Sequence, residues 1–183
     1  MSRILLDTNV LWSPALRDTL LRAAELRLFQ PLWSDDILAE LIRTILAKRS
    51  EVRPESITRT VERMRKAFPA AMIADYAALL PGLTNHPGDR HVLAAAIHGK
   101  AERIATWNRR HFLPTAERDH GIAVLTPDRL LSELWEDNAA AMRQLLIKQG
   151  ADLYPPHSLA AILRSLERSG TKRFAQLVGD SAE

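Results

Sequence analysis

The sequence predicts an α/β protein built around a doubly wound parallel sheet that is flanked by helices. Short apolar runs such as Ile4–Leu6 end abruptly on polar residues, which is typical of parallel strands buried on both faces. Segments with helical spacing of apolar residues alternate with these runs, as expected when crossover helices join neighbouring parallel strands. Beyond residue 136 only helical patterns occur, and they predict a C-terminal helical extension.

Five stretches have the length and apolar content of short strands. In a doubly wound sheet their carboxyl ends face one crevice, where ligands bind. The predicted strands are residues 4–6, 28–33, 70–74, 103–106 and 121–125.

The predicted helices begin at recognisable capping residues. Ser13-Pro14 and Thr126-Pro127 each combine an N-cap with proline at the first helical position. An alanine-rich helix runs from Asp89 to His98, and Gly99 is expected to end it as the residue after the cap. Residues 81–88 are expected to form a loop. The remaining helices are expected to open at Ser34 and near Pro54, and the helix after Pro127 is expected to reach about Glu136.

These patterns divide the chain into a sheet domain, residues 1–136, and a helical extension, residues 137–183. The extension carries an apolar stripe that must be buried against other residues. The stripe consists of Leu159, Ile162, Leu163 and Leu166.

Composition limits the classes of function. The chain has 183 residues, 46% of them hydrophobic and 26% charged, and it has no cysteine. This excludes disulfides and thiolate metal sites and agrees with a reducing cytoplasm. No apolar run is long enough to span a bilayer, and Met1-Ser2-Arg3 leads directly into a strand, so we expect neither a membrane span nor a signal peptide. The net charge of +3 permits a nucleic-acid partner.

Three carboxylates are expected to meet at the carboxyl edge of the sheet. Asp7 follows the first strand, Glu40 lies in a helix, and Asp89 begins a helix after a loop. Hard oxygen ligands of this kind hold Mg²⁺ or Mn²⁺, and a bound ion activates water toward phosphorus. Each acid also has a simpler interpretation: an Asx turn for Asp7, a salt bridge for Glu40 and an N-cap for Asp89.

Taken in order, these segments resemble the PIN domain, the nuclease fold of VapC-type toxins in bacterial toxin–antitoxin pairs. The resemblance covers roughly residues 3 to 136. Its most telling parts are Leu6-Asp7-Thr8-Asn9 and the run from Asp89 to Ala96, supported by the Glu40 helix and by Ile104-Ala105-Thr106-Trp107-Asn108.

The resemblance implies an endoribonuclease that depends on Mg²⁺ or Mn²⁺, with Asp7, Glu40 and Asp89 as metal-binding and catalytic acids. It assigns Asn9 to support of the Asp7 loop, and Thr106 and Asn108 are expected to support the same edge. It also implies an antitoxin that covers the site, and it allows a homodimer. The family often has a fourth acid where this chain has Asn108 or His111, which leaves a second metal ion open. Asp119 could substitute.

Basic residues gather beside this edge. Residues 43–66 contain eight basic and three acidic residues, a local excess of +5. Solvated helix faces would explain the excess, but beside a phosphodiesterase site a track for the RNA backbone explains it better. The residues predicted to bind nucleic acid are Arg59, Arg63, Lys66, Arg109 and Arg110.

The histidines raise a competing interpretation, a zinc site. His91 and His98 are seven residues apart and lack the i, i+4 spacing of a zincin, so solvated or core histidines are the expectation. Competing functions are a housekeeping RNA- or DNA-processing nuclease and a nucleic-acid-binding PIN module with weak catalysis. The latter is suggested by Asn108 and His111.

Overall fold

The computed structural model describes residues 1–181 and divides into two compact units. The sheet unit comprises Met1–Trp12 and Phe29–Leu125. The helical unit comprises Ser13–Leu28 and the chain from Thr126 onward. The predicted boundary at residue 136 does not divide these units, because an N-terminal helix groups with the C-terminal ones. Independent folding of residues 1–136 stays a prediction.

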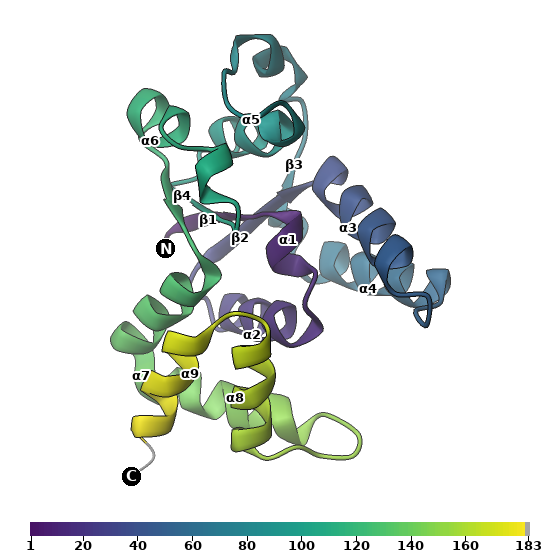
Figure 1. The fold of residues 1–183 in the computed structure, drawn as a ribbon, viewed down its shortest axis with the longest axis vertical. Helices are drawn as coiled ribbons and strands as arrows, with labels where there is room; N and C mark the ends of the chain where they lie inside the picture. Colours follow the sequence, from purple (N-terminus) through teal and green to yellow (C-terminus); the bar gives the residue numbers. More distant parts are fainter. Residues whose placement is uncertain (182–183) are drawn as a thin grey trace. The chain divides into compact units, whose positions relative to one another are not determined.

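The sheet unit contains the predicted parallel sheet (Figure 1). Its five strands run in the order β3-β2-β1-β4-β5, and every neighbouring pair is parallel. The order reverses between β1 and β4, and this is the switch point at which open α/β sheets bind ligands. The strands are β1 (Arg3–Leu6), β2 (Gln30–Ser34), β3 (Met72–Ile73), β4 (Arg103–Ala105) and β5 (Ala123–Leu125).

Helices and 3₁₀ turns connect these strands. In Figure 1, α3 and α4 lie side by side. The helices of the sheet unit are α1 (Thr8–Leu11), α3 (Asp35–Lys48), α4 (Pro54–Ala67), α5 (Arg90–His98) and α6 (Thr115–His120). The 3₁₀ turns are η1 (Pro69–Ala71), η2 (Ala77–Gly82), η3 (Pro87–Asp89) and η4 (Arg109–His111).

The core of this unit is formed by small and apolar side chains that pack on and within the sheet. Leu5 and Leu6 of β1 are fully buried, as a strand covered on both faces requires. Ala94, Ala95 and Ala96 are also fully buried, because α5 packs against β1 and β2.

Gly99 ends α5 for a different reason from the one predicted. Its φ is −73°, and a Cβ there would lie 2.8 Å from Cδ1 of Ile73. The residue with a positive φ of 50° is Lys100. Glycine is therefore needed at this position for close packing, and the left-handed conformation falls one residue later.

Other sequence predictions need local corrections. The third strand is only Met72–Ile73, because Pro69 begins the 3₁₀ turn η1. Residues 81–88 are not entirely loop, since η2 ends and η3 begins within them. The short helix α6 between β4 and β5 was not predicted, although parallel neighbours require such a crossover.

The helical unit packs four helices together. The ring of Trp135 meets that of Phe174 edge-on at 6.4 Å, and Ile162 and Leu166 of the predicted stripe are buried. The helix after Pro127 breaks at Asn138, where φ is −143° and ψ is 44°, so the predicted end near Glu136 falls two residues before the break; a second helical stretch then continues to Ala151. The four helices are α2 (Pro14–Glu25), α7 (Pro127–Ala151), α8 (Leu159–Arg168) and α9 (Lys172–Asp180).

Candidate active site

Asp7 lies at the switch point of the sheet, directly after the end of β1. Its backbone amide donates to the carbonyl oxygen of Ala105 at 3.1 Å, which extends the pairing with β4 by one residue. The side chain is only 3% exposed. Its Oδ2 accepts hydrogen bonds from the Thr106 hydroxyl at 2.7 Å and from the Asn9 amide at 2.6 Å. Two neutral donors therefore hold the carboxylate in place.

The same donors tie the ends of β1 and β4 together. The Asn9 side-chain amide also donates to the Thr106 hydroxyl at 3.1 Å, and Asn9 Oδ1 accepts from the Trp107 amide at 3.0 Å. The Thr106 hydroxyl accepts from the amide of Asn108 at 3.0 Å. Asn9 and Thr106 thus link both loops to Asp7, and Asn108 joins the network through its backbone.

Burial raises the pKa of the Asp7 carboxyl to about 6. The hydrogen bond from Thr106 opposes this shift, whereas the negative charges of Asp89 and Glu40 add to it. Neutral donors compensate the charge of Asp7 only in part. A cation nearby would favour the ionised carboxylate.

Glu40 lies on α3 opposite His91 of α5. Glu40 Oε2 and His91 Nε2 are 3.4 Å apart, an ion-pair distance at which the geometry does not complete a hydrogen bond. This polar contact lowers the pKa of the Glu40 carboxyl and raises that of the His91 imidazole. Glu40 is therefore ionised at neutral pH.

Asp89 precedes α5 but does not cap it. Its backbone occupies the N-cap position, yet the side chain makes no capping hydrogen bond. The carboxylate instead contacts His111, with 2.8 Å between Oδ2 and Nδ1, and His86, with 3.2 Å between Oδ2 and Nδ1. The capping interpretation is therefore wrong, and the carboxylate is engaged by imidazoles.

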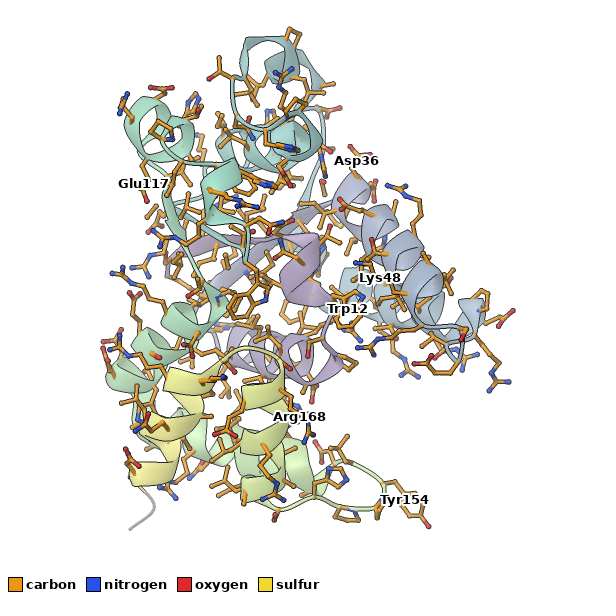
Figure 2. All side chains as sticks on the ribbon, viewed as in Figure 1. Trp12, Asp36, Lys48, Glu117, Tyr154 and Arg168 are labelled. Atoms are coloured by element: carbon orange, nitrogen blue, oxygen red, sulfur yellow. The ribbon has the colours of Figure 1, made fainter. Side chains whose placement is uncertain are left out.

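The predicted acids come together in one pocket with a volume of about 440 Å³, which we call the acidic pocket. Sequence reasoning missed Thr44 and Lys48, although they follow Glu40 on one helix face at intervals of four residues. It also missed Trp12, which Figure 2 labels together with Lys48. The lining residues are Asp7, Thr8, Asn9, Trp12, Glu40, Thr44, Lys48, Asp89 and Asn108.

The donor set of this pocket fits a hard divalent cation. Its carboxylates include the buried Asp7, which within residues 1–181 is hydrogen-bonded by the neutral side chains of Asn9 and Thr106 and not by a cation. Mg²⁺ and Mn²⁺ prefer such oxygens, and Mg²⁺ keeps several water ligands, for which the pocket has room. Asp7, Glu40 and Asp89 are the residues that could hold the ion.

Comparison with known protein families matches residues 3–110, more than half of the chain, to the PIN domain. The chain belongs to the PIN domain family. A relative from Mycobacterium tuberculosis, described as "Putative ribonuclease VapC50", is 38% identical over 88 residues. The match covers 46% of this chain and 52% of that protein, so the chain spans about half of the length of this curated relative. No solved structure matches the chain significantly.

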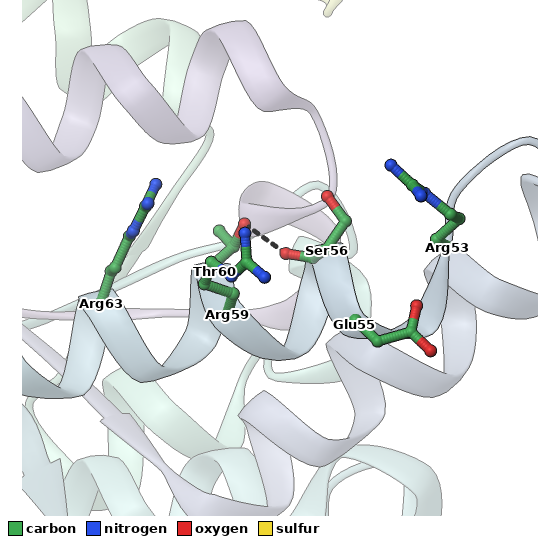
Figure 3. A pocket seen from close by; sticks show the side chains of 6 residues that line it. All are labelled: Arg53, Glu55, Ser56, Arg59, Thr60 and Arg63. Atoms are coloured by element: carbon green, nitrogen blue, oxygen red, sulfur yellow. Dashed lines mark hydrogen bonds between the residues drawn. The ribbon is translucent and has the colours of Figure 1, made fainter.

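The basic residues predicted to bind nucleic acid lie on two elements of this PIN domain protein, α4 and η4. Arg59 and Arg63 of α4 line a second cavity, of about 400 Å³, together with Arg53 (Figure 3). We call it the arginine cavity; its other lining residues are Glu55, Ser56 and Thr60. Lys66 is exposed nearer the end of the same helix.

The second basic group lies on the turn η4. Arg109 and Arg110 are both exposed, and Arg109 Nε donates to the carbonyl oxygen of Val124 at 3.0 Å. Neither residue lines the acidic pocket. The guanidinium of Arg49 lies 4.0 Å from the centre of the ring of Trp12, which is one of the residues lining that pocket.

Three histidines contact the acids of the PIN domain, which corrects the expectation of solvated or core histidines. His91 pairs with Glu40, and His86 and His111 flank Asp89. His98 is exposed, and within residues 1–181 it belongs to no group of three or more close metal-ligating side chains. Only tertiary contacts bring His86 and His111 together, and their spacing of 25 residues in the sequence does not predict that they meet. Asp119 is exposed on α6 and does not line the acidic pocket.

In the part of the chain that the structure covers, residues 1–181, no helix is both long and apolar enough to cross a membrane.

Proposed function

We propose that this PIN domain protein is a metal-dependent endoribonuclease and the toxin of a toxin–antitoxin pair. The observation that carries the proposal is the acidic pocket, where Asp7, Glu40 and Asp89 meet at the switch point of the sheet. Membership of the PIN domain family and the similarity to VapC50, described as a ribonuclease, support it.

We assign Mg²⁺ or Mn²⁺ to the acidic pocket, held by Asp7, Glu40 and Asp89. When bound, such an ion neutralises phosphate charge and lowers the pKa of a coordinated water. Asn9 and Thr106 keep Asp7 in one orientation, so little reorganisation is needed at the reacting phosphate. Asn108 offers a neutral carbonyl oxygen at the rim.

We propose that water is the nucleophile and that side chains of the pocket orient the phosphate. The hydroxyl of Thr8, which also lines the pocket, donates its proton to the carbonyl oxygen of Ile37 at 3.3 Å. This hydrogen bond gives Thr8 a structural role in the pocket wall and leaves the attack to water. Lys48 contributes a positive charge that can contact a non-bridging phosphate oxygen.

RNA would follow the basic residues on either side of the acidic pocket. Arg59, Arg63 and Lys66 form one part of the track, and Arg109 and Arg110 form the other. The arginine cavity has room for a phosphate group, and phosphate contacts of this kind give affinity without sequence preference. A cognate antitoxin, a homodimer and a cytoplasmic location belong to the same proposal.

Cleavage of structured RNA tests the proposal. The wild-type protein should cut RNA with Mn²⁺ and stop when EDTA is added, and Asp7→Asn should be inactive while retaining its circular dichroism spectrum. Thr58→Ala, an exposed change on α4 outside both cavities, is the matched control and should cut normally. Wild-type activity in EDTA, or full activity of Asp7→Asn, would contradict the assignment.

A second candidate is a nucleic-acid-binding PIN module with weak catalysis, favoured by Asn108 in place of a fourth acid. A binding module would retain RNA without cutting it at any Mn²⁺ concentration. A housekeeping nuclease is distinguished by its gene neighbourhood, since a toxin would lie beside a small gene for a DNA-binding antitoxin.

A further inference from the structure

Two imidazoles converge on one oxygen atom of Asp89. His111 Nδ1 lies 2.8 Å and His86 Nδ1 lies 3.2 Å from Asp89 Oδ2. The two rings stack with their centres 4.3 Å apart and their planes at 17°. Within residues 1–181, these three form the one group of histidine and acidic residues whose ligand atoms all lie within 4.8 Å.

Hydrogen bonding alone does not satisfy this cluster. His86 Nδ1 accepts a hydrogen bond from the Gly88 amide at 3.2 Å, which requires a lone pair on that nitrogen. Asp89 Oδ2 presents lone pairs as well, so two electron-rich atoms face each other across 3.2 Å. A cation bound by both atoms would turn this repulsion into attraction. Gly88 is exposed, and its amide could then bond to water.

A backbone hydrogen bond holds the two histidines of the cluster in place. The amide of His86 donates to the carbonyl oxygen of His111 at 3.1 Å, which holds the loop before α5 against η4. The side chains remain open to solvent, with exposed fractions of 53% for His86, 24% for His111 and 18% for Asp89. An ion can therefore reach ligands whose positions are already set.

We propose that His86, Asp89 and His111 bind a first-row transition metal ion such as Zn²⁺. Imidazole nitrogens favour such ions over Mg²⁺, which prefers oxygen. Three protein ligands leave a position for water or for a substrate oxygen, as in open zinc sites. The site adjoins the acidic pocket and shares Asp89 with it, but its two histidines are not among the pocket's lining residues.

Isothermal titration with Zn²⁺ in a background of excess Mg²⁺ tests the site. The probe variant is His86→Ala/His111→Ala, and the matched control is His98→Ala/His120→Ala, which removes two exposed histidines. We expect one Zn²⁺ per wild-type chain, a loss of at least ~10-fold in affinity for the probe variant, and no change for the control. Equal Zn²⁺ affinity in wild type and probe variant would overturn the proposal.

Two further measurements keep the result decisive. If the double variant does not fold, His86→Ala alone serves, because that side chain is the most exposed of the three. Asp7→Asn should keep the Zn²⁺ site, since Asp7 lies only in the acidic pocket. Zn²⁺ binding that is lost in Asp7→Asn but kept in the histidine variants would place the ion in the acidic pocket and contradict the proposal.

The shared ligand has a consequence that rests on the proposed nuclease function. Zn²⁺ on the histidines would draw Asp89 away from Mg²⁺, so micromolar Zn²⁺ should inhibit Mg²⁺-supported cleavage in the wild type and inhibit the histidine variant less. If no RNA is cut under any condition, the nuclease proposal fails, while the titration still decides the Zn²⁺ site.

Discussion

The acidic pocket and the arginine cavity have similar volumes, about 440 and 400 Å³, but they are built differently. Asp7 is buried at the end of a strand, and hydrogen bonds from Asn9 and Thr106 fix its carboxylate. Arg59 and Arg63 are exposed on the surface of α4. The first region can impose geometry on a reacting group, whereas the second offers positive charge on long side chains.

This difference predicts separate effects on cleavage and on binding. The largest effect is expected for Asp89→Asn, which removes the charge of a proposed metal ligand while leaving the basic residues intact. Cleavage should fall by more than ~100-fold, beyond the range seen when outer ligand partners are lost. RNA affinity, measured by filter binding, should change little. If cleavage and RNA affinity fell together, the acidic pocket would also contribute to binding, and the separation of the two regions would be contradicted.

The next effect concerns the cost of burying Asp7. Because the folded pKa of about 6 exceeds the ordinary 3.8, the folded state retains a proton that the unfolded state has lost. The contribution of Asp7 to stability without metal should therefore fall as pH rises from about 4 to about 6 and then stay level. The full cost approaches about 3 kcal/mol at ~1.36 kcal/mol per pKa unit.

Asp7→Asn carries no such cost, and its side-chain oxygen can still accept from Asn9 and Thr106. Without metal at pH 8 its melting temperature should exceed that of the wild type by several degrees, at ~2–4 °C per kcal/mol. The gain should vanish near pH 4 and shrink when Mn²⁺ stabilises the wild type. A variant less stable than wild type at pH 8 would show that the charge of Asp7 is compensated within the fold.

A smaller effect is expected at the rim of the acidic pocket. Asn108→Asp adds a carboxylate where Asn108 lines the pocket, so Mn²⁺ affinity should rise by about 10-fold. Without metal the added charge repels Asp7, Glu40 and Asp89, and the protein should melt slightly earlier. Calorimetric titration and melting curves measure both changes. If neither differs from wild type, Asn108 does not face the ion.

The smallest effect should come from the arginine cavity. Arg59→Gln/Arg63→Gln should weaken RNA binding and reduce the slope of log affinity against log salt by ~1–2, because fewer counterions are released. Arg118→Gln/Arg168→Gln removes the same charge from exposed positions elsewhere and should leave the slope unchanged. Equal salt slopes for the two double variants would show that Arg59 and Arg63 belong to a solvated helix face and do not contact RNA.

Much of the sheet unit could be predicted because its signals are local. Apolar runs that end on polar residues identified the strands, and the Ser34 and Pro54 starts of α3 and α4 follow from capping chemistry. The parallel sheet was confirmed. The acids could be assigned to one edge because the carboxyl ends of parallel strands meet there, and Asp7, Glu40 and Asp89 do line one pocket.

Contacts between distant residues decided the rest. The sequence alone indicated the apolar runs of the strands and the starts of the helices, because periodicity and capping depend on near neighbours. It could not place His86 and His111 beside Asp89, or group α2 with the C-terminal helices, because long-range packing sets those contacts. The same reason applies to Gly99 at the end of α5: the side chain of Ile73, from β3, required a glycine that helix-ending rules had explained differently.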